Sequence, residues 1–257
     1  MEVWVTGDNQ VIAHKGNSSQ FPENTKAAVK SAIKLGCNVV EVDVSVTLDG
    51  YSVALHGPTL EKSTSGYGRI TETLWRNLHD VSTIGPDNKI TSERVPLIKD
   101  LLQTFGSKTK WNLDLKSGDI EDDLIQVIKE LSLQNRVVLS GLKLSNAKRI
   151  LATNPNLNVV INLSRVDRAI LSMRLFAGPY IKYRFRSISK EPRVVAINLH
   201  YRYTSEAIIK SIKRLGLEIW VYTVDDSDLV NSLFARKVDS VTTNHPSEIL
   251  QYLSICR

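Results

Sequence analysis

The chain has 257 residues, 42% of them hydrophobic, and carries a formal net charge of +6. This length and composition suit one large α/β barrel or two small domains, and the apolar runs are far too short to span a membrane. The positive charge favours anionic partners in general: phosphate esters, lipid headgroups or nucleic acid.

The cysteines and the first residues of the chain indicate the cellular compartment. The two cysteines, Cys37 and Cys256, form neither a disulfide framework nor a metal-binding spacing. The first eight residues lack the basic start and the apolar stretch of a signal peptide. We therefore predict a cytoplasmic protein that is at most peripheral to a membrane.

Short β-type runs alternate with amphipathic stretches along the chain. Strands are predicted at residues 11–14, 39–44, 111–115, 137–140, 159–163, 194–199, 219–224 and 240–243. Helices are predicted at residues 26–35, 97–105, 120–131, 145–153, 167–176, 205–215, 227–235 and 246–253. Eight strands, each followed by a helix, predict an α/β protein with a (β/α)8 TIM barrel. Since no linker is long enough to divide residues 1–257, we expect one domain.

The second predicted strand is followed by the signature of a β-hairpin. Asp49-Gly50 lies between two valine-rich alternating runs, which favours a two-residue type I′ turn. Such a turn places Asp43 opposite His56, and Glu41 shares the face of Asp43 because side chains alternate with a period of two. Burying three ionisable groups together is costly without a metal or a substrate. The hairpin therefore predicts a functional site and extends the barrel after its second strand.

Polar residues lie at the carboxyl ends of most predicted strands. They are His14, Glu41, Asp43, Asp114, Lys116, Asn162, Ser164, Asn198 and His200. In (β/α)8 barrels the chemistry occurs where the strands end and the βα loops begin. The placement of these residues thus predicts an active site at that end of the barrel.

A series of short motifs, in order along nearly the whole chain, resembles the glycerophosphodiester phosphodiesterase family. The motifs are His14-Lys15-Gly16, Pro22-Glu23-Asn24-Thr25, Glu41-Val42-Asp43, His56 with residues 64–68, Val95-Pro96-Leu97, Asn112-Leu113-Asp114-Leu115-Lys116, residues 222–226 and residues 238–244. The resemblance implies metal-dependent hydrolysis of glycerophosphodiesters to glycerol phosphate and an alcohol. It implies that His14 and His56 are the catalytic acid and base. It also implies that the metal ligands are Glu41, Asp43 and, as a changed residue, Asp114.

The residue types suit this chemistry. A phosphodiester is negatively charged and resists attack, so its hydrolysis needs charge neutralisation, a base, and an acid for the leaving alkoxide. Carboxylates are hard oxygen ligands, which favours one divalent cation, Mg²⁺ or Ca²⁺, over zinc. Lys15 and Lys116 are expected to hold phosphate oxygens, and the two histidines titrate near neutrality. The expected partner is a small-molecule glycerophosphodiester.

Other interpretations remain open at several positions. Glu23 and Asn24 either line the substrate site or begin a helix that is capped by Asn24 or the following threonine. Lys15, Gly57 and Tyr222 depart from the family pattern, and Tyr222 stands where a tryptophan of the substrate pocket is typical. These departures leave a non-catalytic phosphate-binding barrel as one alternative. A lysophospholipase D, with the same centre but a wider apolar mouth, is another.

Residues 165–193 follow the fifth strand and combine basic with aromatic side chains. The basic ones are Arg165, Arg168, Arg174, Lys182, Arg184, Arg186, Lys190 and Arg193, and the aromatic ones are Phe176, Tyr180, Tyr183 and Phe185. The segment is either a solvated surface or a peripheral contact with an anionic membrane or lysophospholipid headgroup. It has no nucleic-acid recognition motif, so no nucleic acid partner is expected.

Overall fold

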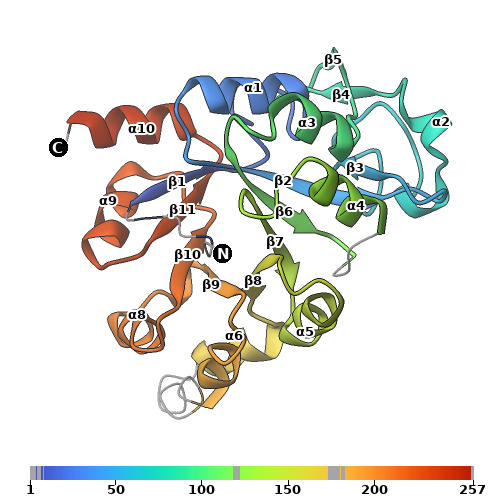
Figure 1. The fold of residues 1–257 in the computed structure, drawn as a ribbon. Helices are drawn as coiled ribbons and strands as arrows, with labels where there is room; N and C mark the ends of the chain where they lie inside the picture. The colour runs from blue at the N-terminus through green and yellow to red at the C-terminus, as the bar shows by residue number, and fades with distance from the viewer. Residues whose placement is uncertain are drawn as a thin grey trace.

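A computed structural model of the chain describes residues 4, 7, 9–117, 122–172, 180 and 183–255, and eight parallel strands in this part close into a barrel (Figure 1). The barrel strands are β1 (Gln10–Ala13), β2 (Val39–Val46), β6 (Lys110–Leu115), β7 (Val137–Leu142), β8 (Asn158–Asn162), β9 (Val194–His200), β10 (Glu218–Tyr222) and β11 (Ser240–Thr243). Strand β1 pairs in parallel with both β2 and β11, which closes the ring. The predicted (β/α)8 barrel is confirmed.

Helices surround the barrel, with their apolar faces against the outward faces of the strands (Figure 1). They are α1 (Lys26–Lys34), α3 (Ile98–Phe105), α4 (Asp122–Glu130), α5 (Leu144–Thr153), α6 (Arg165–Ser172), α8 (Glu206–Lys213), α9 (Ser227–Ala235) and α10 (Pro246–Ile255). Helix α6 begins two residues earlier than predicted, and its predicted end lies outside the described residues. Within the described part of the chain, no helix has the length and apolar character needed to cross a bilayer.

Inward-facing residues change from apolar to polar toward the carboxyl ends of the strands. The apolar layer consists of Trp4, Ile12, Val39, Val138, Val160, Val195, Ala196 and Trp220. Two residues further along their strands, His14, Glu41, Ser140, Asn162, Asn198 and Tyr222 line a pocket. Because side chains alternate along a β-strand with a period of two, an apolar layer fills the barrel interior directly below a polar pocket at the carboxyl ends of the strands.

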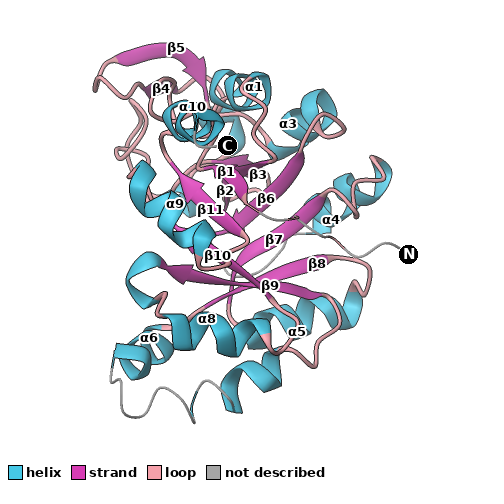
Figure 2. Cartoon of the chain, turned by 90° about the vertical axis from the view of Figure 1, so that its left-hand side faces the viewer, coloured by secondary structure: helices cyan, strands magenta, loops and turns pink. Residues whose placement is uncertain are grey.

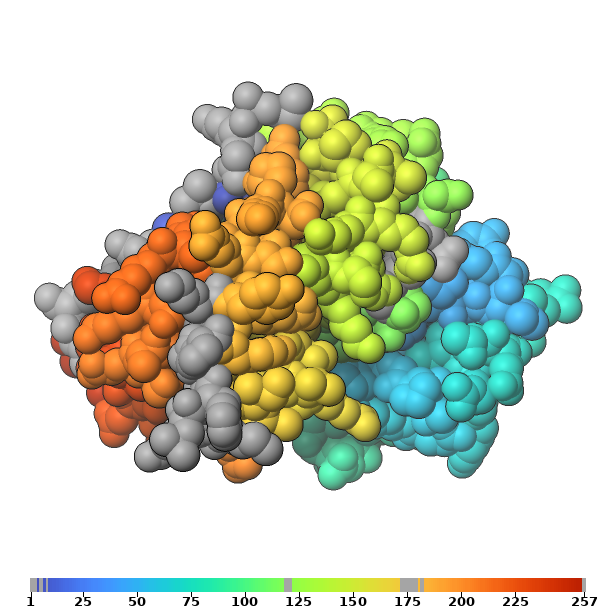
Figure 3. All heavy atoms as spheres, turned by 90° about the horizontal axis from the view of Figure 1, so that it is seen from below, coloured from blue at the N-terminus to red at the C-terminus, as the bar shows by residue number. Residues whose placement is uncertain are grey.

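An extension of the barrel lies between β2 and α3. It contains β3 (Ser52–Ala54), the short helices η1 (Ile70–Glu72) and α2 (Trp75–Leu78), and a ribbon of β4 (Ser82–Ile84) and β5 (Ile90–Arg94). A small core of its own holds it together, made of Val53, Leu55, Leu60, Ile70, Leu78 and Val95. The ribbon lies beside α1 at the rim of the barrel (Figures 1 and 2), and the extension projects sideways in the space-filling view (Figure 3).

The predicted hairpin is present, but the prediction of a two-residue turn is wrong. Val46 pairs with Ser52, so the loop has three residues, 48–50. Only Gly50 among these has a positive φ, +84°, which fits a three-residue loop rather than a type I′ turn. Asp49 is held outside that conformation because its Oδ1 accepts hydrogen bonds from the Thr47 hydroxyl (2.8 Å) and the Trp75 amide (2.9 Å).

The one-residue change in register also corrects the predicted pairing of Asp43 with His56. Leu55 lies opposite Asp43 instead, and its amide donates to the Asp43 carbonyl (3.2 Å). Strand β3 has already ended at Ala54, so the chain is free to turn His56 toward the barrel mouth. The imidazole reaches Asp43 from there, with Nδ1 3.0 Å from Oδ2.

Candidate active site

Three carboxylates converge at the mouth of the barrel. Glu41 and Asp43 project inward from β2, and the parallel register places Asp114 of β6 directly beside Asp43. Glu41 and Asp43 are buried, and oxygen atoms of all three groups lie within 4.8 Å of one another. The structure therefore brings together the three metal ligands that the family resemblance implied.

The electrostatics of this cluster call for a cation. Burial raises the pKa of Glu41 well above its usual range, and the neighbouring charges of Asp43 and Asp114 raise it further. Lys116 supplies part of the compensating charge, because its Nζ lies 2.5 Å from Asp43 Oδ1 and 2.5 Å from Asp114 Oδ2. Burial alone would lower the pKa of Lys116, but the three carboxylates raise it overall. Hard oxygen donors at this spacing fit a divalent cation such as Mg²⁺ or Ca²⁺.

Asp43 is the most firmly held of the three. Asn24 donates from Nδ2 to Asp43 Oδ2 (2.9 Å) and accepts from the Asp43 amide (2.9 Å), while His56 Nδ1 donates to the same Oδ2. Burial alone would raise the pKa of Asp43, but the hydrogen bond from His56 and the charges of Lys116 and Lys15 hold it well below its usual range. Asn24 thus binds both the carboxylate and the backbone N–H of Asp43, and the cap of α1 is Thr25.

Lys15 and Glu23 form a pair beside the cluster. Lys15 Nζ donates to Glu23 Oε2 (2.7 Å) and lies 3.8 Å from Asp43 Oδ2. The backbone of Lys15 is also engaged, since its amide donates to Glu41 Oε2 (2.7 Å). The lysine charge therefore lies beside the carboxylates, and its role in holding phosphate oxygens stays a prediction.

The two histidines contact different carboxylates. His14 Nε2 lies 4.0 Å from Glu41 Oε2, and its Nδ1 lies 2.6 Å from Asn244 Oδ1, within hydrogen-bond distance. Burial and the charge of Lys15 lower the pKa of His14, so that its neutral form predominates near pH 7. His56 lies against Asp43, at the opposite side of the β2 carboxylates. Their placement agrees with the predicted acid/base pair, whose roles stay a prediction.

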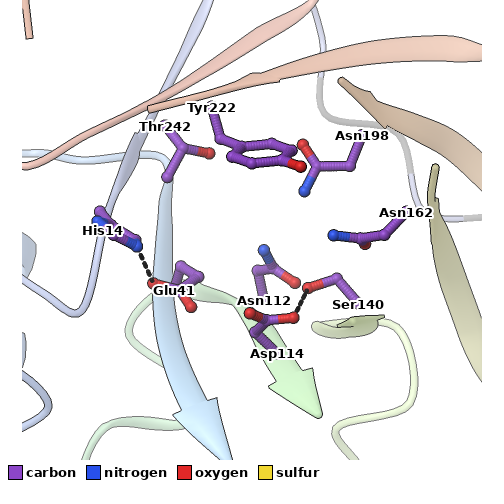
Figure 4. A pocket seen from close by; sticks show the side chains of 9 residues that line it. All are labelled: His14, Glu41, Asn112, Asp114, Ser140, Asn162, Asn198, Tyr222 and Thr242. Carbon is purple, nitrogen blue, oxygen red and sulfur yellow. Dashed lines mark hydrogen bonds and ion pairs between the residues drawn. The ribbon is translucent and has the colours of Figure 1, made fainter. Parts of the chain in front are cut away.

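A pocket of about 100 Å³ opens beside Glu41 and Asp114 (Figure 4). Apart from His14, Glu41 and Asp114, its wall carries neutral amides and hydroxyls: Asn112, Ser140, Asn162, Asn198, Tyr222 and Thr242. The Oδ1 atoms of Asn112 and Asn198 are buried without a hydrogen-bond partner among the described residues. Unpartnered buried acceptors of this kind require a polar ligand or water. The wall thus suits an uncharged, hydroxyl-bearing group.

A second hollow lies on the other side of Lys116. It has a volume of about 290 Å³ and is lined by Ser45, Val46, Gly57, Pro58, Ile70, Thr71, Lys116 and Ser117. Gly57, which departs from the family pattern, faces Ile70 of the extension, whose Cδ1 would be 3.2 Å from an added Cβ. The hollow joins the barrel mouth to an apolar wall of the extension.

Several supporting residues were missed by the sequence analysis. Asn244 and Ser140 contact His14 and Asp114, and Gly141 packs against Asp114. Ser140 ends a predicted strand, so the rule that polar strand ends form the site would have included it. Asn244 directly follows the last predicted strand, so the same rule would have included it. Gly141 carries no such signal, because it has no side chain.

The basic segment is only partly described, since Arg174, Phe176 and Lys182 lie outside the described residues. Arg184 Nε donates to Asp167 Oδ1 (3.0 Å), and Phe185 is fully buried. These two side chains therefore have internal roles and do not support the predicted membrane contact. Tyr183 is exposed.

Residues 14–248 match the model of the glycerophosphoryl diester phosphodiesterase family. A glycerophosphodiester phosphodiesterase of Caldanaerobacter subterraneus is 26% identical over 249 residues, which cover 93% of this chain and 96% of that protein. A probable glycerophosphodiester phosphodiesterase 2 of Mycobacterium tuberculosis is 25% identical over 259 residues, covering 98% of this chain and 92% of that one.

Solved structures have the same fold. A phosphodiesterase of Oleispira antarctica, in complex with the product sn-glycerol-3-phosphate, covers 95% of this chain and 96% of its own with a TM-score of 0.79 at 22% identity. A putative glycerophosphodiester phosphodiesterase of Galdieria sulphuraria has a TM-score of 0.78 at 18% identity, covering 99% of this chain and 100% of its own. The resemblance inferred from the motifs is confirmed by the match to the family.

Proposed function

Because this chain belongs to the glycerophosphoryl diester phosphodiesterase family, we propose that it hydrolyses glycerophosphodiesters with one divalent cation and two histidines. The enzyme is a phosphoric diester hydrolase, and its products are glycerol phosphate and an alcohol. The observation that carries the mechanism is the cluster of Glu41, Asp43 and Asp114 with His14 and His56 at its two sides.

The three carboxylates would hold Mg²⁺ or Ca²⁺. When bound, the cation neutralises charge on the phosphate and stabilises the charge that develops during displacement. Lys15 and Lys116 add positive charge at the edge of the cluster, so they are suited to hold phosphate oxygens through charge-assisted hydrogen bonds.

The histidines differ in a way that suggests a division of roles. Because Nδ1 of His14 is occupied by Asn244, its Nε2 is the atom free to take the proton of the neighbouring glycerol hydroxyl as that oxygen attacks phosphorus and forms a cyclic phosphate. Asp43 accepts from His56 Nδ1 and so stabilises the doubly protonated ring. His56 then gives its other proton to the oxygen of the departing alcohol as its bond to phosphorus breaks. Water opens the cyclic phosphate in a second step with the roles reversed: His56 takes the proton of the attacking water, and His14 returns its proton to the glycerol oxygen, which yields glycerol phosphate. General acid and base groups of this kind each contribute about 10²–10⁴-fold in rate.

The two hollows suggest how a substrate lies across the centre. The amide-lined pocket beside His14 suits the hydroxyls of a glycerol group, with Asn112 and Asn198 as acceptors. The leaving alcohol would then extend past Lys116 into the hollow of the extension. This orientation places the glycerol end near the proposed base and the alcohol near the proposed acid.

Chelation tests the function most directly. Turnover of glycerophosphocholine is expected to stop in excess EDTA and to return with added Mg²⁺ or Ca²⁺. Asp43→Asn removes one ligand charge and is expected to lower metal-dependent turnover by at least about 10²-fold, while circular dichroism shows an intact fold. Undiminished turnover in EDTA would refute the role of the metal. A folded wild-type protein without turnover at any metal concentration would favour the non-catalytic alternative.

The apolar wall of the second hollow favours a lysophospholipase D as the second candidate. Thr71 is exposed on η1 and lines this hollow, so Thr71→Trp would fill part of it. The variant is expected to raise KM for a lysophospholipid at least about tenfold more than for glycerophosphocholine. The reason is that the added indole blocks the contact between the acyl chain and the apolar wall, and burial of that apolar area contributes more than about 1 kcal/mol to binding. Glu72→Trp is the control, since Glu72 is exposed on the same turn and does not line the hollow. Equal effects on both substrates would contradict this candidate.

A further inference from the structure

His14 is connected to a carboxylate that takes no part in the mechanism above. Its Nδ1 contacts Asn244 Oδ1 at 2.6 Å, and Asn244 Nδ2 in turn donates to Asp225 Oδ2 (2.8 Å). Asp225 follows β10 and Asn244 follows β11, so these two residues belong to neighbouring βα loops. The three residues form a chain of hydrogen bonds that ends on the proposed base.

Asp225 determines which group donates and which accepts in each hydrogen bond of this series. A carboxylate can only accept hydrogen bonds, and Asp225 Oδ1 accepts two more, from the Thr243 hydroxyl (2.9 Å) and the Asn244 amide (2.8 Å). The Thr243 hydroxyl is itself oriented, because its oxygen accepts from the His245 amide (3.1 Å). Asn244 must therefore present its NH₂ group to Asp225 and its carbonyl oxygen to His14.

The ring nitrogen that faces Asn244 must consequently carry a hydrogen. Glu41 opposes this arrangement, because its Oε2 lies 4.0 Å from the other ring nitrogen and attracts a hydrogen there (Figure 4). A hydrogen on Nε2 would block the atom that has to accept a proton. We infer that Asp225 is a positioning residue that, through Asn244, keeps neutral His14 in the Nδ1–H tautomer with Nε2 free.

Hydrogen-bond pairing predicts what happens when Asp225 becomes asparagine. The amide oxygen of the new side chain would keep the place of Oδ1, where two donors face it, and its NH₂ would then face the NH₂ of Asn244. Asn244 would have to turn over, which presents NH₂ to His14 Nδ1 and drives the ring hydrogen to Nε2. Adding Asn244→Asp removes the conflict, because a carboxylate at 244 accepts from both neighbours.

Nitrogen-15 NMR of the imidazole rings reads the tautomer directly, independently of turnover. Spectra are recorded at pH 8 with saturating Mg²⁺, and His14→Gln identifies the His14 signals among the five histidines. Wild type is expected to show Nδ1–H, Asp225→Asn to show Nε2–H, and Asp225→Asn with Asn244→Asp to return to Nδ1–H. Asp226→Asn is the matched control, because Asp226 is the neighbouring residue and caps α9, a role that asparagine fills equally well.

Turnover should follow the tautomer, a consequence that rests on the proposed function. Asp225→Asn is expected to lower kcat about 10- to 100-fold, since reaching the productive tautomer then leaves a hydrogen bond unmade, and the double variant is expected to recover most of the rate. An Nε2–H tautomer in wild type, or an unchanged tautomer in Asp225→Asn, would overturn the inference. The expected tautomers in a protein without diesterase activity would support the inference and refute the proposed function alone.

Discussion

Gly141 supports the carboxylate cluster by having no side chain. Its φ is +77°, and an added Cβ would lie 2.5 Å from the Leu115 carbonyl and 2.6 Å from Asp114 Oδ1. Its amide also donates to Asn162 Oδ1 (3.0 Å), one of the pocket-lining amides. Gly141 therefore leaves room for the carboxylate of Asp114, a proposed metal ligand, and orients the side chain of Asn162 in the pocket.

Gly141→Ala is expected to weaken metal binding about 10- to 100-fold, because Asp114 has to move away from the new methyl group. Gly36→Ala is the matched control: Gly36 also has a positive φ, +83°, but an added Cβ there would touch nothing within 4 Å. Both variants are expected to lose about 1–2 kcal/mol of stability to backbone strain, and Gly141→Ala is expected to lose more, because its methyl group also clashes with the Leu115 backbone. Isothermal titration with Mg²⁺ separates the two effects. Equal metal affinities in both variants would contradict this role of Gly141.

At the scale of elements, the beginning of α6 shows how one carboxylate connects a helix to the segment after it. Asp167 Oδ2 accepts from the Ser164 amide (2.7 Å), and the Asp167 amide donates to Ser164 Oγ (3.1 Å), which is a capping box. Asp167 Oδ1 accepts from the Tyr180 hydroxyl and from Arg184 Nε. Burial alone would raise the pKa of Asp167, but these hydrogen bonds lower it overall.

Asp167→Ala is expected to destabilise the protein by about 1–3 kcal/mol at pH 7, because it removes the cap and leaves partly buried donors unpaired. Since the folded-state pKa of Asp167 lies below the ordinary value of 3.8, its contribution is complete above that value and is lost as the pH falls below it. Urea unfolding at pH 7 and at pH 3 measures the change. Asp80→Ala, at an exposed aspartate, is the control and should change stability by less than about 0.5 kcal/mol. A difference between Asp167→Ala and wild type that does not shrink at pH 3 would contradict the argument.

The periodicity of apolar residues predicted most of the barrel. It failed at the turn and in the extension, where contacts with residues distant in sequence determine the local conformation. The barrel strands and their helices follow periods of 2 and 3.6, which a single sequence displays. The turn at Asp49-Gly50 could not be read in this way, because Trp75, distant in sequence, binds Asp49. The elements from η1 to β5 were not predicted, since they are short and depend on a small core of their own.

The same distinction applies to the candidate site. Glu41, Asp43, Asp114 and His14 could be predicted to meet, because each lies at an inward position near the end of its strand. The contacts of Asn24 with Asp43 could not, because they depend on the path of a loop. They give Asn24 a supporting role beside the carboxylate, one that was not among the alternatives predicted for it.

The molecule as a whole carries a net charge of +6, which should favour the approach of anionic substrates. We expect kcat/KM for glycerophosphoglycerol, a monoanion, to fall at least about threefold between low salt and 0.5 M NaCl, because screening shortens the reach of the protein's field to a few ångströms. Glycerophosphocholine has no net charge and should respond less, and kcat should change little for either diester. Identical salt dependences for the two substrates would contradict long-range attraction.

The closure of the ring by β1 and β11 has a consequence for the enzyme during its synthesis. His14 and Asn244 are 230 residues apart in the chain, whereas all three carboxylates lie within its first 114 residues. A chain emerging from the ribosome thus carries its three proposed metal ligands well before Asn244, the residue proposed to orient its base, has been translated. Under the proposed function, full activity therefore requires the last strand of the barrel, and unfinished chains are expected to turn over diesters more slowly than the finished enzyme.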